Sequence, residues 1–285
     1  MNLRPALAAA LLFSLLTAAE PSIGMPESGV DLPMADAGGR PVLSVRVNGK
    51  GPFNFILDTG ADTTVVDEDL VGRHTTPGEA PNPPMAEESA VKVESLEIGD
   101  ALLRDVEVHP APLSRTFGDV LSVRGVLSAA SFPGYLLVLD YPAKRIRIHK
   151  GDLPAADLLT RFQYTAEQIL PNVPLKVCGT EVRMHVDAGS PGGVTLPTRY
   201  MKELPLASAP VQIGRARTAA GEFAVWSAEV KGTIMLGSYK LEGPTVEFSD
   251  VNPIPGPLTG NLGYQTLRQF VITLDSKNRR IQFDR

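Results

Sequence analysis

The sequence predicts an all-β protein built from two tandem copies of one unit, and three observations support this prediction. Short apolar segments alternate with polar residues and end at turn residues, as in 90–100. Proline and glycine are abundant, with 25 and 26 of the 285 residues, which suits many short strands better than a helical bundle. A segment late in the chain also repeats an earlier one at a fixed spacing.

The composition excludes several classes of protein. Hydrophobic residues make up 43% and charged residues 21% of the chain, as in a globular protein. The net charge of −5 and the lack of a long basic run argue against nucleic acid as a partner. Cys178 is the single cysteine, so no intramolecular disulfide is expected, and the four histidines have no spacing that suits zinc. We therefore expect neither a metal nor a cofactor.

The first residues have the pattern of a secretory signal peptide. Arg4 precedes an apolar run over 6–16, and small residues follow at 17–19. The run is too short for a comfortable membrane span, so we expect cleavage of residues 1–19, no stable membrane span afterwards, and a periplasmic or secreted protein. An uncleaved N-terminal anchor is the alternative. Residues 20–40 are predicted to be an irregular lead-in, and whether they act as a pro-segment stays open.

The first copy opens with a predicted β-hairpin. Residues 41–47 alternate as a half-buried strand, Asn48-Gly49 is a turn signal, and 53–57 form the return strand, which delivers Asp58. Residues 67–71 favour a short helix. Further strands are predicted from Ala90 up to a turn at Gly99-Asp100, and at 106–109, 135–140 and 145–148.

The second copy is found by direct superposition of the sequence on itself. Leu139-Asp140 and the ten residues after it align without a gap on Leu274-Asp275 and its successors, an offset of 275 − 140 = 135. Upstream, Asp58 aligns with Asp187 at 187 − 58 = 129. Fixed-order self-similarity indicates duplicated architecture. We expect a first lobe over 41–150, a connector over 151–171 and a second lobe over 172–285.

The segment around Asp58 combines an apolar run with Asp-Thr-Gly-Ala-Asp and then Thr-Thr-Val-Val. This pattern resembles the active-site loop of the retropepsin-like aspartic proteases. The resemblance implies two β-barrel lobes with a central cleft, in which each lobe supplies one catalytic Asp. The catalytic pair would be Asp58 and Asp187, and the supporting active-site residues would be Thr59, Gly60, Ala61, Asp62, Ala188, Gly189 and Ser190.

The resemblance also implies a mechanism. Two adjacent carboxylates share one proton, so one activates a water molecule while the other protonates the scissile carbonyl. Asp58 and Asp187 would thus hydrolyse peptide bonds of a peptide or protein substrate without a metal. We expect a monomer in which the two lobes of one chain pair, because in-chain pairing gives a high effective concentration. Pairing of two first lobes from different chains is the alternative.

Three positions depart from the family pattern. Ala188 lacks the hydroxyl that usually follows the catalytic Asp and joins the lobes, although Ser190 resembles a serine that hydrogen-bonds the carboxylate in pepsin-like enzymes. The motif Val126-Leu127-Ser128 ends in Ser where the second lobe has Gly263. Asp62 pairs in retroviral relatives with an Arg, and that position is Ala129 here.

Two other functions therefore remain as alternatives. Ala188 and Ser128 favour a catalytically weakened or inactive homologue that binds peptides or a partner protein. Ser190, in Ala-Gly-Ser-Pro-Gly, resembles a serine hydrolase nucleophile, but Pro191 and the glycines after it are a poor start for the helix that such an elbow requires.

The resemblance also places a flap, a hairpin that closes over the substrate, in each lobe. The first flap would fall at 74–89 and the second within 216–229. Trp226 lies in the second of these, and we interpret it as a packing aromatic because an aromatic in a strand pattern usually belongs to the core.

Overall fold

The computed structural model describes residues 22–72, 90–114, 122–165, 170–218, 221–250 and 259–285. The protein is all-β, with 54% strand and 8% helix, as the sequence predicts. The predicted signal peptide at 1–19 and the whole of the first flap segment at 74–89 lie outside the described residues. Within the described ranges, no helix has the length and apolar character that crossing a membrane requires.

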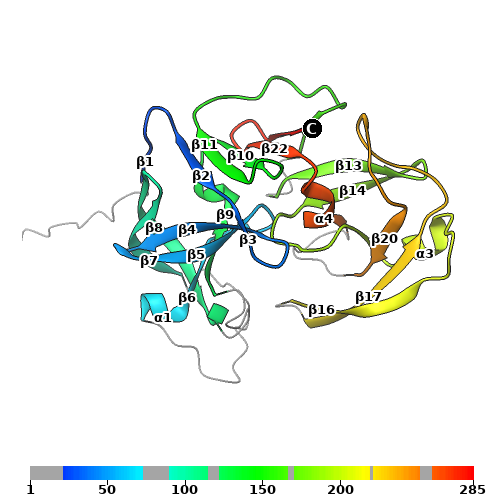
Figure 1. The fold of residues 1–285 in the computed structure, drawn as a ribbon, viewed down its shortest axis with the longest axis horizontal. Coiled ribbons are helices and arrows are strands. Elements are labelled where there is room, and N and C mark those ends of the chain that lie inside the picture. Colours follow the sequence, from blue (N-terminus) through cyan, green and yellow to red (C-terminus); the bar gives the residue numbers. More distant parts are fainter. Residues whose placement is uncertain (1–21, 73–89, 115–121, 166–169, 219–220, 251–258) are drawn as a thin grey trace, which may run out of the picture.

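The first lobe is a closed six-stranded barrel in which each strand pairs with two neighbours (Figure 1). Around the ring its strands are β4 (Pro41–Val47), β5 (Lys50–Asp58), β9 (Val123–Ser128), β6 (Val65–Asp67), β8 (Ala101–Ala111) and β7 (Val91–Ile98). Short strands extend it, β1 (Ser22–Gly24) on β8 and β3 (Ala35–Asp36) on β4. Closure buries the apolar face of each strand without leaving free edges.

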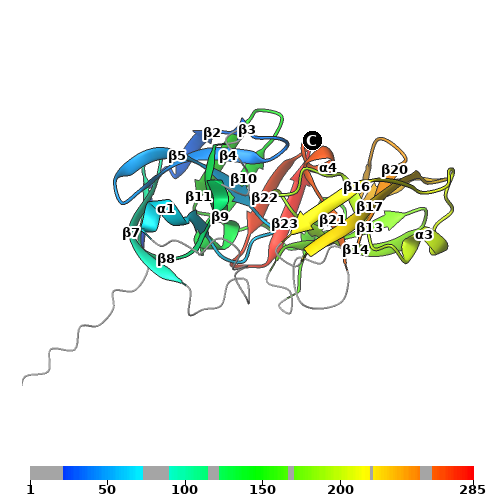
Figure 2. The ribbon, with the colours of Figure 1, turned by 90° about the horizontal axis from the view of Figure 1, so that it is seen from below.

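The second lobe repeats part of this strand order within an open nine-stranded sheet. Its order is β16 (Val211–Thr218), β17 (Gly221–Glu229), β20 (Thr245–Phe248), β15 (Val194–Leu196), β21 (Gly260–Leu262), β14 (Thr180–Val186), β13 (Asn172–Val177), β18 (Ile234–Leu236) and β19 (Tyr239–Lys240). The hairpin β16–β17 extends from this lobe toward the first (Figures 1 and 2). It occupies the place predicted for the second flap.

The same packing device recurs in both lobes and explains two glycines of the repeat. A Cβ on Gly125 would overlap the ring of Phe55, and a Cβ on Gly260 would overlap the side chain of Met184. Phe55 and Met184 are fully buried and differ by 184 − 55 = 129 positions, the offset of the two Asp residues. Glycine at each site lets a large core side chain lie flat against the neighbouring strand.

A six-stranded sheet joins the lobes and contains the duplicated segments (Figure 1). Its order is β12 (Arg161–Gln163), β23 (Arg280–Asp284), β22 (Val271–Asp275), β10 (Leu136–Asp140), β11 (Arg145–His149) and β2 (Val30–Pro33). β10 and β22 run antiparallel, and Val138 pairs with Thr273, its own equivalent at 273 − 138 = 135. A pseudo-twofold axis therefore passes through this pair.

Most predicted elements are confirmed, and one is wrong. The hairpin turn forms at Asn48-Gly49, with positive φ at both residues, as a tight two-residue turn requires. Short helices are α1 (Glu68–Val71), the 3-10 turn η2 (Ala129–Ser131), α3 (Tyr200–Glu203) and α4 (Tyr264–Leu267). The lead-in at 20–40 is not irregular, because β1, β2 and β3 form there; β1 and β2 pair with strands far along the chain, and β3 pairs with the adjacent β4.

Candidate active site

Each lobe delivers its aspartate at the end of a buried strand. β5 lies parallel to β9, with Leu57 opposite Leu127, and β14 lies parallel to β21, with Val186 opposite Leu262. All four of these side chains are buried. The apolar strands therefore fix the direction in which the chain leaves the barrel, and both aspartates emerge where the lobes meet.

The structure brings Asp58 and Asp187 together, and their carboxyl groups share a hydrogen bond. Asp58 Oδ1 accepts the backbone N–H of Gly60 at 2.7 Å and that of Gly189 at 3.2 Å. A Cβ on Gly60 would lie 2.8 Å from Asp187 Cγ, and one on Gly189 would overlap the Asp58 carboxyl group. Both glycines are therefore needed because each backbone lies against the opposite carboxyl group.

Burial and mutual repulsion make the pair hold a proton. Burial, with the neighbouring Asp187 charge, raises the pKa of Asp58 to about 7. Burial also raises the pKa of Asp187, while hydrogen bonds from Asn261 and from the Asp58 carboxyl group oppose that rise. Two close carboxylates titrate as a unit, so the raised pKa describes the pair, which holds one proton between its two groups.

Thr59 connects the two loops through one hydroxyl. Its Oγ1 donates to the carbonyl oxygen of Val186 at 2.6 Å and accepts the N–H of Ala188 at 3.0 Å. Thr59 and Ala188 are both buried. A hydroxyl at position 188 would make the equivalent bonds to the first loop, and Ala188 lacks it. The Thr59 hydroxyl remains, and it makes two hydrogen bonds to the second loop.

The other two departures have structural solutions. Ser128 adopts φ −68°, which any residue tolerates. Its hydroxyl donates to the carbonyl of Ala61 at 2.7 Å and caps η2 by accepting the N–H of Ala130 at 3.0 Å. Ser128 therefore braces the Asp58 loop with a hydrogen bond that glycine cannot make. Asp62 is exposed, so it does not build the buried site.

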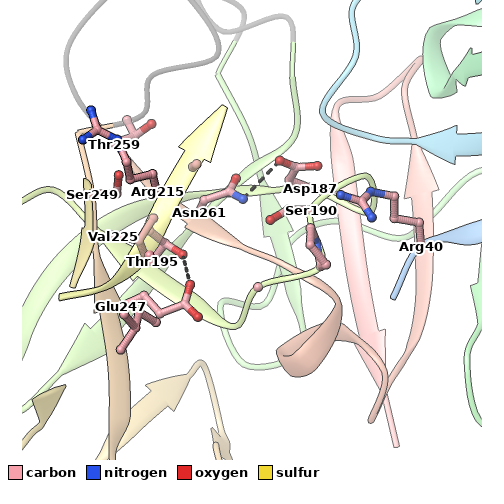
Figure 3. A pocket seen from close by; sticks show the side chains of 15 residues that line it. Arg40, Asp187, Ser190, Thr195, Arg215, Val225, Glu247, Ser249, Thr259 and Asn261 are labelled. Carbon is pink, nitrogen blue, oxygen red and sulfur yellow. Dashed lines mark hydrogen bonds between the residues drawn. The ribbon is translucent and has the colours of Figure 1, made fainter. Parts of the chain in front are cut away.

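Asn261 supplies the side-chain hydrogen bond to Asp187. Its Nδ2 donates to Asp187 Oδ2 at 3.1 Å (Figure 3). Ser190, for which the sequence suggested this role, contributes its backbone N–H instead, which bonds the Asp187 carbonyl at 3.3 Å and lowers the pKa of the Asp187 carboxyl group. The Ser190 carbonyl in turn accepts the N–H of Tyr264 at 2.8 Å, which ties the loop to α4.

Arg40 reaches this site from the first lobe, between β3 and β4. Its Nε donates to the Gly189 carbonyl at 2.8 Å, and its side chain points toward Asp187 (Figure 3). Partial burial lowers the pKa of Arg40, while Asp187 and, more weakly, Asp58 oppose that change. Tyr141, buried behind the pair, has its pKa raised by burial and by the two carboxylates.

A pocket of about 620 Å³ opens beside Asp187 and extends beneath the β16–β17 hairpin (Figure 3). Its walls combine apolar groups of Ile213 and Val225 with polar groups of Arg215 and Glu247. Glu247 is oriented by Thr195, whose hydroxyl donates to its carboxylate at 3.0 Å. Trp226, in the same hairpin, packs against the core as predicted. The volume is that of a binding site for an extended or drug-sized molecule.

The sequence matches the family described as aspartyl protease over residues 43–128 and again over 173–266. The chain belongs to this family. Each match contains one of the two aspartates, so each lobe corresponds to one retropepsin-like unit. No individually characterised protein matched the chain. A family of aspartyl proteases acts on peptides, and peptide substrates are the class this chain inherits.

The family membership and the geometry argue against a serine hydrolase. After Ser190 the chain continues without a helix into β15, so the strand–turn–helix of a nucleophile elbow is not formed. The described residues also contain no cluster of His, Cys, Asp and Glu that could hold a metal ion. What the arrangement offers is a buried, proton-sharing pair of carboxyl groups beside a pocket.

Sequence reasoning missed two residues of the site. Asn261 stood in the motif Asn261-Leu262-Gly263, where the first lobe has Val126, and a polar residue in an apolar position was the available signal. Arg40 carried no signal, because its approach to Gly189 spans 149 residues of sequence.

Proposed function

We propose that this protein is an exported aspartic endopeptidase that hydrolyses peptide bonds with a water molecule activated between Asp58 and Asp187. The observation that carries the proposal is the hydrogen-bonded carboxyl pair, buried at the junction of two lobes that both match an aspartyl protease family. The buried hydroxyl bridge of Thr59 supports it, because catalysis needs the two carboxyl groups held at working distance.

The chemistry needs one proton on the pair. One carboxylate removes a proton from water as the water oxygen attacks the scissile carbonyl carbon, and the other carboxyl group gives its proton to the carbonyl oxygen. The resulting tetrahedral diol collapses with proton transfer to the leaving nitrogen, so no covalent intermediate with the protein forms. Because the pKa of Asp58 is raised to about 7, the singly protonated pair persists to near-neutral pH.

The test is hydrolysis of a fluorogenic peptide library between pH 3 and 8 by the purified protein, with and without pepstatin. We expect turnover that declines as the pH rises through about 7, because the pair then loses its last proton. Asp58→Asn and Asp187→Asn should each abolish turnover while leaving the fold intact by circular dichroism. Retained turnover in either variant would refute the shared pair.

The absent hydroxyl at Ala188 favours one second function, a peptide-binding homologue without catalysis. The same library distinguishes it, because a binder shows saturable binding and no cleavage at any pH.

Export and assembly are parts of the proposal with their own measurements. An intact Met1 on exported material would contradict cleavage of residues 1–19, and a dimeric active species would contradict pairing of the lobes within one chain.

A further inference from the structure

Besides Ser128 and Gly263, the two lobes differ at a second position of the motif that supports each Asp loop. β9 lies parallel to β5, and β21 lies parallel to β14, so the two supporting strands are equivalent. The repeat offset pairs Val126 with Asn261, since 261 − 126 = 135. The first lobe thus places a hydrocarbon side chain where the second lobe places a carboxamide.

The carboxamide of Asn261 is only half satisfied. Its Nδ2 donates to Asp187 Oδ2 at 3.1 Å, whereas its Oδ1 is buried and has no partner among the described residues. A buried acceptor without a partner costs stability, and the valine of the first lobe avoids that cost. The position of Asn261 is therefore better explained by its effect on Asp187 than by packing.

That effect is on the location of the proton. A donated hydrogen bond favours the ionised form of a carboxyl group, and the hydrogen bond from Asn261 opposes the rise in the pKa of Asp187. Asp58 accepts two backbone N–H groups at Oδ1 but has no carboxamide donor from β9, where the equivalent residue is Val126.

Other charged or titratable groups around Asp187 come from two loops and two strands. Arg40, between β3 and β4, interacts more strongly with Asp187 than with Asp58, and so acts in the same direction as Asn261. Tyr141, after β10, is buried with its hydroxyl unpartnered among the described residues. Farther out, Arg215 on β16 and Glu247 on β20 line the pocket.

We propose that Asn261 is a positioning residue that keeps Asp187 ionised and the shared proton on Asp58, which makes Asp187 the general base and Asp58 the general acid. This inference rests on the proposed function and assigns its two roles. Asp187 takes a proton from water while the water oxygen bonds to the carbonyl carbon. Asp58 gives its proton to the carbonyl oxygen, so the pair keeps one proton in total through the step.

The test replaces Asn261 with the residue of the first lobe. In Asn261→Val the acid limb of the kcat pH profile should move to higher pH by about one unit, because the donor that favours ionised Asp187 is lost. kcat at acidic pH should fall about tenfold with little change in KM. Asn261→Ser, whose hydroxyl is too short to reach, should show the same shift and serves if the valine variant fails to fold.

The reciprocal variant, Asn261→Val with Val126→Asn, transfers the carboxamide to the first lobe. Carbon-13 NMR of labelled aspartate carboxyl groups, assigned with Asp58→Asn and Asp187→Asn, reports which group ionises first without requiring turnover. We expect Asp187 to ionise first in the wild-type protein and Asp58 to do so in the reciprocal variant. Asp187 ionising first in both proteins would overturn the inference.

A purely structural role would lower kcat by the same factor at every pH, with the acid limb and the carboxyl titration unchanged, and that result would also overturn the inference. Failure of the proposed function looks different. In that case the wild-type protein cleaves no peptide, while the NMR titration still reports whether Asn261 determines the order of ionisation.

Discussion

The two loops that carry Asp58 and Asp187 occupy equivalent places in the two lobes but are held by different groups. The first loop is braced by its own lobe, through the Ser128 hydroxyl on the Ala61 carbonyl. The second is held within its own lobe by the Tyr264 N–H on the Ser190 carbonyl, and the first lobe also bonds it through Thr59 and the Arg40 side chain. The first lobe thus bonds across to the second loop with side-chain donors, whereas the second lobe bonds back to Asp58 with the backbone N–H of Gly189.

The strongest way to break this comparison is to remove the Thr59 hydroxyl. Thr59→Val keeps the shape but leaves the buried Val186 carbonyl and Ala188 N–H without their partner. We expect stability to fall by about 1–3 kcal/mol and kcat to fall about a hundredfold, because the second loop loses both of its hydrogen bonds to the Thr59 hydroxyl. Urea unfolding and steady-state kinetics measure the two effects.

Thr59→Ser is the matched control, because it retains the hydroxyl and loses only a methyl group. It should remain close to the wild-type protein in both measurements. Equal losses in the valine and serine variants would show that the methyl group, not the hydrogen-bonded bridge, matters at this position.

The second prediction concerns how far the buried carboxyl pair lowers the stability of the folded protein. The pKa of Asp58 is about 7 in the folded protein, against an ordinary value of 3.8. Between these pH values the unfolded chain has released a proton that the folded protein still binds, so stability falls as the pH rises through this window. Asp58→Asn removes this loss and should raise Tm by several degrees at pH 8, with little change at pH 3.5.

The control for this variant is Asp62→Asn, which removes an exposed carboxylate of the same loop. Its Tm should match that of the wild-type protein at both pH values, because surface substitutions have small effects. If the difference in Tm between Asp58→Asn and the wild-type protein were the same at both pH values, the carboxyl pair would not destabilise the folded protein at neutral pH.

The smallest effect is expected from restoring the symmetry of the loops. Ala188→Ser introduces a hydroxyl that, by the pseudo-twofold relation, would face the Leu57 carbonyl and the Thr59 N–H. We expect kcat to rise a few-fold, because the pair would be held from both sides. Ala188→Val adds volume without a hydroxyl at a fully buried position and should reduce activity and stability. A serine variant as impaired as the valine variant would show that the second loop has no room for the reciprocal bond.

The sequence predicts the repeat, the two aspartates and most strands because these depend on local patterns. Alternation and turn residues define β4 and β5, and the fixed offset finds Asp187 once Asp58 is known. Strands β1 and β2 of the lead-in were missed because their partners, β8 and β11, lie far along the chain. Arg40 was missed for the same reason, since no local pattern marks a side chain that crosses to the other lobe.

The roles within the site were harder to predict than its members. Family resemblance suggested Ser190 as the donor to Asp187, yet a loop position alone does not say where a hydroxyl points. The donor is Asn261, whose amide reaches Asp187 from the adjacent parallel strand. Strand register, which is a property of the folded sheet, decides which side chain lies beneath a catalytic group.

The sheet that joins the lobes also determines when the catalytic pair can exist. β10 finds its partner β22 only after an intervening stretch that includes the whole sheet of the second lobe, so the contact between Val138 and Thr273 closes a loop of 135 residues. Contacts of such long range form late in folding, after local hairpins are in place. During synthesis, the first barrel can fold with Asp58 already in position while its partner is still absent. Asp58 and Asp187 therefore come together only once the second lobe has folded against the first.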